Sequence, residues 1–189
     1  MSEPRRISLP FTADVVRDLR AGDELLLSGP AYTARDAAFA RLVEQRPADV
    51  LQQLRGQLVF FAGPTPPRAD RPAGAIGPTT ASRMDALQVQ LMDDGVLYTL
   101  GKGSRGQQYV DAARAHGAVY LAAVGGAAAL LARAVNASRI VAWPDLGTEA
   151  VARLNLVDFP AFVAIDASGN DIYRTAPQQW RVQRQGTQQ

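Results

Sequence analysis

The 189-residue sequence contains no cysteine. The chain therefore cannot form disulfides, use a thiolate nucleophile or hold an iron–sulfur cluster by itself. Histidine is almost as scarce, since His116 is the only one. A single histidine argues against a histidine-rich metal site and against a Ser-His-Asp triad. His116 precedes Gly117 at the end of a predicted helix, and we interpret it as a structural or surface residue.

Long apolar segments and runs of one charge are also missing. No uninterrupted apolar stretch is long enough to span a membrane, and the N-terminus lacks the apolar region of a signal peptide. The net charge is only +2, without a basic run, so nucleic acid is not indicated as a partner. The composition predicts one globular domain in the cytoplasm. We place this domain at residues 1–174 and expect the glutamine-rich residues 175–189 to form a frayed tail.

Lysine is the third scarcity. Of twenty lysine and arginine residues, only Lys102 is a lysine, and it lies between two glycines in Gly101-Lys102-Gly103. This position favours a role for a compact ammonium group, which a forked guanidinium does not replace. Chance placement of one lysine is the alternative interpretation.

The sequence does contain an alternation of apolar strand segments and periodic helical segments. This alternation predicts an α/β domain, while a terminal hairpin over 162–174 argues against a uniformly parallel sheet. A long loop over 63–77 is rich in proline and glycine, and loops of this length are typically functional. Strands are expected at 24–28, 57–62, 96–100, 118–122 and 139–143, and helices at 33–46, 79–92, 104–116, 127–135 and 147–153.

Cations and a hydroxyl occur where strands are predicted to pass into helices. Thr79 stands at a predicted helix start, with Arg83 one turn later on the same face. Arg35 lies inside a T-x-x-D capping box, and Lys102 precedes an S-x-x-Q box. In an α/β fold such junctions can gather at one edge of the sheet and form a pocket for a dianion. Three unrelated capped helices with solvated cations are the alternative.

The chain contains a series of short segments whose order is informative: Leu27-Ser28-Gly29, Tyr32-Thr33-Ala34-Arg35-Asp36-Ala37-Ala38, Gly63-Pro64, Gly77-Pro78-Thr79-Thr80-Ala81-Ser82-Arg83-Met84-Asp85, Gly101-Lys102-Gly103, Gly125-Gly126-Ala127-Ala128, Leu146-Gly147-Thr148-Glu149-Ala150, Asp158-Phe159-Pro160-Ala161-Phe162 and Gly169-Asn170-Asp171. Together, over residues 8–174, they resemble the β subunit or C-terminal domain of the class I fumarase and L(+)-tartrate dehydratase family. The resemblance implies a swivelling β/β/α domain of three layers with a mixed sheet.

The same resemblance implies that this chain supplies half of an active site. In the family, a partner α subunit holds a [4Fe–4S] cluster through three cysteines, so no cysteine is needed here. The implied activity is reversible hydration of a small dicarboxylate, fumarate to malate, with L(+)-tartrate dehydration as the alternative. Thr79 is implied to be the general base, while Arg35, Arg83 and Lys102 would bind the substrate and stabilise its enolate-like charge.

The resemblance leaves the assembly and one further function class open. A homodimer or an α2β2 assembly is expected, with no nucleic acid and no membrane as partner. The alternative outside the enzymes is a non-catalytic relative that binds anions or serves assembly.

Two positions depart from the family pattern. Phe39 stands where the family usually has histidine, and Ser82 stands where it usually has glycine. Phe39 removes a polar group near Arg35, which bears on the identity of the substrate. A packing role for Phe39 on its helix is the alternative.

Overall fold

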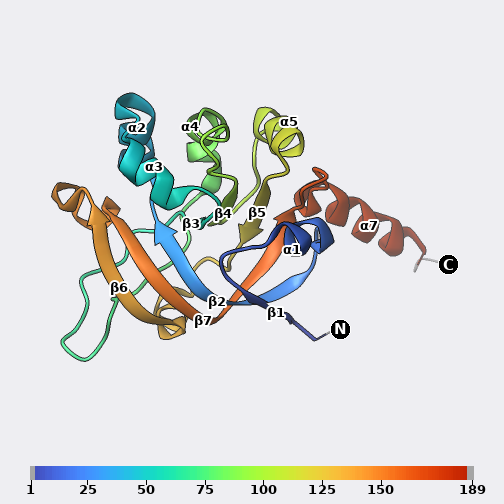
Figure 1. The fold of residues 1–189 in the computed structure, drawn as a ribbon. Coiled ribbons are helices and arrows are strands. Elements are labelled where there is room, and N and C mark those ends of the chain that lie inside the picture. The colour runs from blue at the N-terminus through green and yellow to red at the C-terminus, as the bar shows by residue number, and fades with distance from the viewer. Residues whose placement is uncertain (1–2, 187–189) are drawn as a thin grey trace.

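The computed structural model describes residues 3–186 as a seven-stranded mixed sheet with helices, which confirms the predicted α/β class (Figure 1). The strands are β1 (Arg5–Ser8), β2 (Glu24–Thr33), β3 (Leu58–Phe60), β4 (Tyr98–Gly101), β5 (Val119–Ala122), β6 (Val135–Ala142) and β7 (Val151–Ile165). The α-helices are α1 (Ala13–Asp18), α2 (Asp36–Gln45), α3 (Ala48–Leu54), α4 (Asp85–Val89), α5 (Gln107–His116), α6 (Ala128–Leu131) and α7 (Ile172–Gly186). The 3-10 helices of the described residues are η1 (Ala81–Met84), η2 (Ala132–Ala134) and η3 (Pro144–Glu149).

Five of the strands pair in a closed ring. Strands β1 to β5 form a parallel ladder, and the long strand β7 runs antiparallel to β5, β6 and β2. Because β2 pairs with both β3 and β7, the order of neighbours β2–β3–β4–β5–β7 returns to β2. The sheet thus has an enclosed side and an outer side, with β1 and β6 at its edges.

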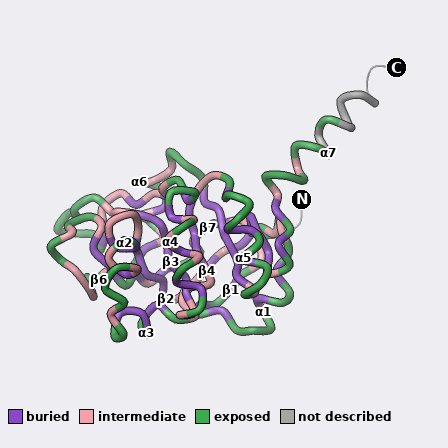
Figure 2. The backbone as a smooth tube through the Cα atoms, turned by 90° about the horizontal axis from the view of Figure 1, so that it is seen from above, coloured by how far each residue is buried: buried purple, intermediate pink, exposed green. Residues whose placement is uncertain are grey.

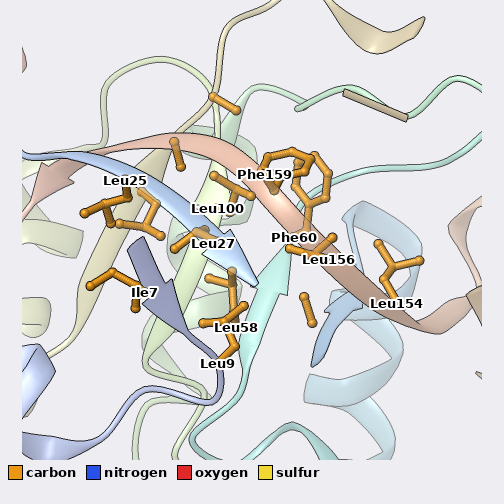
Figure 3. Close-up of a cluster of buried hydrophobic side chains, with 14 of the residues drawn as sticks. Ile7, Leu9, Leu25, Leu27, Leu58, Phe60, Leu100, Leu154, Leu156 and Phe159 are labelled. Carbon is orange, nitrogen blue, oxygen red and sulfur yellow. The ribbon is translucent and has the colours of Figure 1, made fainter. Parts of the chain in front are cut away.

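The enclosed side is filled by a cluster of buried apolar side chains (Figure 3). Side chains alternate along a strand, so Leu58 and Phe60 of β3 point into this cluster while Val59 belongs to the cluster on the outer side. Phe60 meets Phe159 of β7 edge to face, with ring centroids 5.4 Å apart. Burying each such side chain stabilises the fold by about 1.5–3 kcal/mol. This cluster joins β7 to the parallel strands.

The outer side is covered by helices α2 to α5 (Figure 1), which pack on a second apolar cluster. Helix α2 contributes Phe39 and Leu42, and α5 contributes Tyr109 and Val110. The burial pattern follows, since the residues facing the sheet are buried and the outward helix faces are exposed (Figure 2). The start of α2 is thereby held beside the end of β2 with Arg35 between them, while Thr79 and Arg83 lie at η1 and Lys102 follows β4.

Both predicted capping boxes are wrong. Thr33 is the last residue of β2, and its hydroxyl bonds across the sheet, donating to the Ala150 carbonyl at 3.3 Å and accepting from the Ala152 N–H at 3.0 Å. Helix α2 therefore begins at Asp36, without a side-chain cap. Helix α5 begins only at Gln107, after Gly106 as the capping residue. In both cases the polar side chain expected to cap is three residues from the first helical residue.

The C-terminal part also differs from expectation. The predicted second strand of the terminal hairpin is reduced to a single bridge between Ile165 and Asp171, and α7 begins at the next residue. The tail expected to be frayed from residue 175 is helical as far as Gly186, and 187–189 lie outside the described residues. The views in Figures 1 and 2 agree that α7 projects away from the sheet. Among residues 3–186, no helix has the length and apolar character needed to cross a membrane.

Candidate active site

Thr79 and Lys102 are brought together by backbone hydrogen bonds at the ends of β3 and β4. The Thr79 N–H and the Thr79 hydroxyl both donate to the Phe61 carbonyl, at 2.8 and 3.0 Å. The Lys102 N–H donates to the Thr79 carbonyl at 3.0 Å, and the Ala81 N–H donates to the Lys102 carbonyl at 2.9 Å. The hydroxyl and the lysine singled out in the sequence are therefore neighbours, and the hydroxyl oxygen keeps lone pairs free to accept a hydrogen bond.

Arg35 and Arg83 meet on one carboxylate, that of Asp36. Arg83 binds it through two nitrogens, with Nε 2.9 Å from Oδ1 and Nη2 3.0 Å from Oδ2. The Nε of Arg35 lies 3.0 Å from the same Oδ2. Partial burial by itself would raise the pKa of Asp36, but hydrogen bonds from Arg35, from its own backbone and from Arg83 outweigh it and lower the pKa. Asp36 is thus an anion that orients two cations.

Glu149 is a second carboxylate in this group, and the sequence reasoning did not assign it to the site. Its Oε2 accepts from the Ala37 N–H at 2.8 Å, in the first turn of α2, where a negative charge is favourable. Its Oε1 lies 3.4 Å from Nε of Arg35. The available signal was its place in the segment Leu146–Ala150, one of those that carry the family resemblance. Asp36, next to Arg35, was missed in the same way.

Gly63 lies between Arg35, which binds Asp36, and the backbone that holds Thr79. A Cβ atom at Gly63 would lie 2.8 Å from the Thr148 carbonyl and 3.5 Å from Cδ and Nη1 of Arg35. Such a close approach requires glycine. Since Phe61, two residues earlier, holds Thr79, one short segment contacts both groups. The structure therefore places the four predicted residues on one surface, as two adjoining pairs.

Lys102 is the cation of this surface that has no ion pair or side-chain hydrogen bond within residues 3–186. Its side chain is half-buried and runs past Gly125, where a Cβ atom would lie 3.3 Å from Cδ and 3.7 Å from Nζ. Gly103, with φ of +82°, turns the chain immediately after the lysine. The backbone thus fixes Lys102 while leaving its ammonium group available to an anion.

The surface is open, in contrast to the predicted pocket with three helix N-termini. Only Arg35 directly precedes an α-helix, because Thr79 leads into η1 and Lys102 lies before the start of α5. None of the four side chains lines the best-formed cavities among residues 3–186. The largest of these, about 430 Å³, lies beside the site between loop 63–77 and the strands β6 and β7. Within the described chain, the site is exposed on one side.

Phe39 is a packing residue. Its side chain is fully buried and meets Phe61 edge to face, with centroids 5.3 Å apart. Because the Phe61 carbonyl accepts both hydrogen bonds from Thr79, this aromatic pair supports the residue that holds Thr79. Ser82, the other unusual position, is exposed in η1.

The residues of the site do not form a ligand set for a metal or cluster. The sequence has no cysteine, and residues 3–186 contain no group of three or more side chains of His, Cys, Asp or Glu that could hold a metal ion. The carboxylates of Asp36 and Glu149 are instead used by arginines and by a helix N-terminus.

Comparison with known proteins gives a consistent result. A family model described as the fumarase C-terminus matches residues 2–176. The chain is 40% identical over 155 residues to "Fumarate hydratase class I, anaerobic" of Escherichia coli K12, covering 79% of this chain and 28% of that protein. It is 37% identical over 156 residues to "Fumarate hydratase 2" of Leishmania major, covering 80% of this chain and 28% of that protein.

A shorter relative matches over almost its full length. The chain is 34% identical over 171 residues to "Putative L(+)-tartrate dehydratase subunit beta" of Methanocaldococcus jannaschii, covering 86% of this chain and 88% of that protein. By contrast, the chain spans little more than a quarter of the length of the two fumarate hydratases.

Proposed function

This chain belongs to the fumarase C-terminus family, and on that premise we propose that it is the β subunit of an iron–sulfur-dependent hydro-lyase that interconverts fumarate and malate. The observation that carries the proposal is the contact between Thr79 and Lys102. Their backbones are hydrogen-bonded to each other, so the Thr79 hydroxyl lies near a lysine that has no ion pair in the described chain. A family member with this contact offers a proton acceptor beside a cation, which dehydration of a hydroxy-dicarboxylate requires.

Each side chain has a distinct proposed role. In dehydration, a proton leaves a carbon next to a carboxylate, negative charge builds up on that carboxylate, and hydroxide leaves the neighbouring carbon, for which the partner's cluster would supply a Lewis acid. Thr79 would accept the proton at Oγ1, and Lys102, Arg35 and Arg83 would bind the carboxylates and stabilise the charge. A neutral threonine hydroxyl is a poor base, so Thr79 would first have to lose its own proton to a group from the partner, and the surrounding positive charge would stabilise the resulting alkoxide. Asp36 and Glu149 would orient the arginines.

The cluster is proposed to belong to the partner. This chain has no cysteine, and its carboxylates are engaged elsewhere, so we assign the [4Fe–4S] cluster to an α subunit. The open face around Thr79 is then where the α subunit would dock, in a homodimer or an α2β2 assembly. A swivelling β/β/α arrangement and a cytoplasmic location complete the proposal.

A second substrate class has a specific observation in its favour. One relative that this chain matches over most of both lengths carries the name of a tartrate dehydratase β subunit. L(+)-tartrate, another 2-hydroxy-dicarboxylate, would use the same cations and the same hydroxyl. A non-catalytic anion-binding or assembly role is the remaining alternative.

The test is turnover by the complex reconstituted anaerobically with its α subunit, measured with fumarate, malate and both tartrates. Thr79→Val, which removes the hydroxyl and keeps the side-chain shape, should abolish turnover without preventing assembly. Thr79→Ser, which keeps a hydroxyl, should retain measurable turnover. Near-normal kcat in Thr79→Val would contradict the assignment of the base, and an inactive wild-type complex with all four substrates would favour the non-catalytic alternative.

A further inference from the structure

Arg105, three residues after Lys102, is a buried cation to which the proposed function gives no role. Its side chain has no exposed surface. Its Nε donates to Oδ1 of Asp85, its Nη2 donates to Oε1 of Gln88 at 2.8 Å, and its Nη1 lies 3.5 Å from Oγ1 of Thr99. A buried charge is costly unless it is paired and hydrogen-bonded, so this site is built around the guanidinium.

Aromatic rings enclose the same guanidinium. Its central carbon lies 3.4 Å from the ring centroid of Tyr109, 4.9 Å from that of Tyr120 and 5.5 Å from that of Phe61. Such cation–π contacts are stronger when they are desolvated. Phe61 is also the residue whose carbonyl holds Thr79. Arg105 therefore links α4, β4, β5 and α5 to the end of β3.

Two hydrogen bonds tie this cluster to the segment after Lys102, one at the turn itself and one at the start of α5. The Tyr120 hydroxyl donates to the Gly103 carbonyl at 2.9 Å, directly after the lysine. The Gly106 N–H donates to Oδ2 of Asp85 at 2.7 Å, directly after Arg105. Burial raises the pKa of Tyr120, so its hydroxyl stays protonated and remains a donor.

We propose that Tyr120 and Arg105 are positioning residues that hold the Lys102 turn against Thr79. The Lys102 backbone is bonded to Thr79 and Ala81 on one side, and the following glycine is bonded to Tyr120 on the other. A turn containing glycine with positive φ is flexible unless it is held. The proposal rests on the proposed function for the role of Lys102, but the restraint on the turn is a separate physical property.

The two tyrosines offer a matched pair of variants. Both are fully buried, both stack on Arg105, and their rings meet edge to face with centroids 6.4 Å apart. Only Tyr120 bonds to the turn, because the Tyr109 hydroxyl has no hydrogen-bond partner within residues 3–186. In the reconstituted complex, Tyr120→Phe should lower kcat/KM about tenfold, whereas Tyr109→Phe should leave it unchanged.

A double-mutant cycle separates positioning from a general effect on stability. In a Lys102→Ala background, adding Tyr120→Phe should change kcat/KM by less than about twofold, because the residue through which it acts is gone. The change in Tm caused by Tyr120→Phe should be the same in both backgrounds. A loss of activity that is equal with and without Lys102 would overturn the proposal and leave the proposed function intact.

Amide exchange tests the restraint without turnover. In the full chain, the Lys102 N–H should exchange about tenfold faster in Tyr120→Phe than in the wild type, and at the wild-type rate in Tyr109→Phe. An unchanged rate in Tyr120→Phe would overturn the proposal. If the wild-type complex showed no turnover, the proposed function would fail, and the exchange rates would decide on the restraint alone.

Discussion

Lys102 is the only lysine of the chain, and arginine should not be able to take over its role. Its stem packs beside Gly125, and its backbone is fixed to Thr79. We expect Lys102→Arg to lower kcat/KM of the complex about a hundredfold, because a wider guanidinium cannot occupy the position of the ammonium group. Steady-state kinetics of the complex measure this change.

The control for this substitution is the reverse exchange at an exposed site. Arg139→Lys replaces a guanidinium by an ammonium group on an exposed position of β6, away from the site. It should leave both kcat/KM and Tm unaltered. If Lys102→Arg keeps more than half of the wild-type activity, Lys102 is not the substrate-binding cation proposed here.

The ion pairs of Asp36 predict how the stability of the folded chain responds to acid. Arg35 and Arg83 lower its pKa below the ordinary value of 3.8, so its stabilising effect is complete above that pH and fades as the pH falls through the lowered value. Asp36→Asn should therefore have a lower Tm than the wild type at neutral pH, and the difference should vanish in stronger acid. Asp70→Asn, in loop 63–77, should match the wild type at every pH. A difference between Asp36→Asn and the wild type that persists in strong acid would contradict the ion-pair explanation.

At the scale of single elements, the sequence predicted where helices lie better than where they begin. The S/T-x-x-D/Q pattern was present at Thr33 and Ser104, but Thr33 had a stronger use in the sheet, bonding to Ala150 and Ala152. Local spacing cannot reveal a partner more than a hundred residues away. Arg35 and Lys102 were found because they follow strand ends, which local patterns do indicate, whereas Thr79 and Arg83 follow loop 63–77 and were found from the helix start predicted there.

Helix α5 supplies a prediction with the opposite pH dependence. His116 ends this helix before Gly117, as expected, and its Nδ1 lies 2.8 Å from the Ala112 carbonyl while Nε2 lies 3.1 Å from Asp93. The hydrogen bond to Ala112, followed by the one to Asp93, raises the pKa of His116. Its contribution is therefore complete below pH 6.5 and is lost as the pH rises through the raised value.

The variant that tests this contribution is His116→Gln. It should unfold at lower urea concentration than the wild type below pH 6.5, by about 0.5 kcal/mol in unfolding free energy, and should match the wild type in alkaline solution. Asp93→Asn should reduce this pH dependence, because it removes the exposed partner of the imidazolium. Equal stability of His116→Gln and the wild type at low pH would show that the raised pKa has no energetic consequence.

At the scale of the whole molecule, the mixed sheet was predictable but its closure was not. Alternating strands and helices indicate the parallel ladder β2–β5, because each crossover is local, whereas β1 was not predicted. Strand β7 was predicted as a helix followed by a short strand, since Asp158 and Pro160 interrupt its apolar pattern. In the structure the chain bends at Asp158, with φ of +48°, and continues as one strand paired to β2. This pairing joins segments from opposite ends of the chain, which no local signal reports.

The closed sheet leads to the last prediction, which concerns the chain on its own. Two buried clusters cover both sides of the sheet, so the isolated chain should fold with one cooperative transition. It should nevertheless show no hydratase turnover and no iron–sulfur absorbance, because it has no cysteine and its Thr79 surface is open. Spectra and assays before and after anaerobic addition of the α subunit measure both properties, with Thr79→Val as the control for background activity. Turnover by the isolated chain above that background would contradict the half-site proposal, since one surface without its partner would then suffice for catalysis.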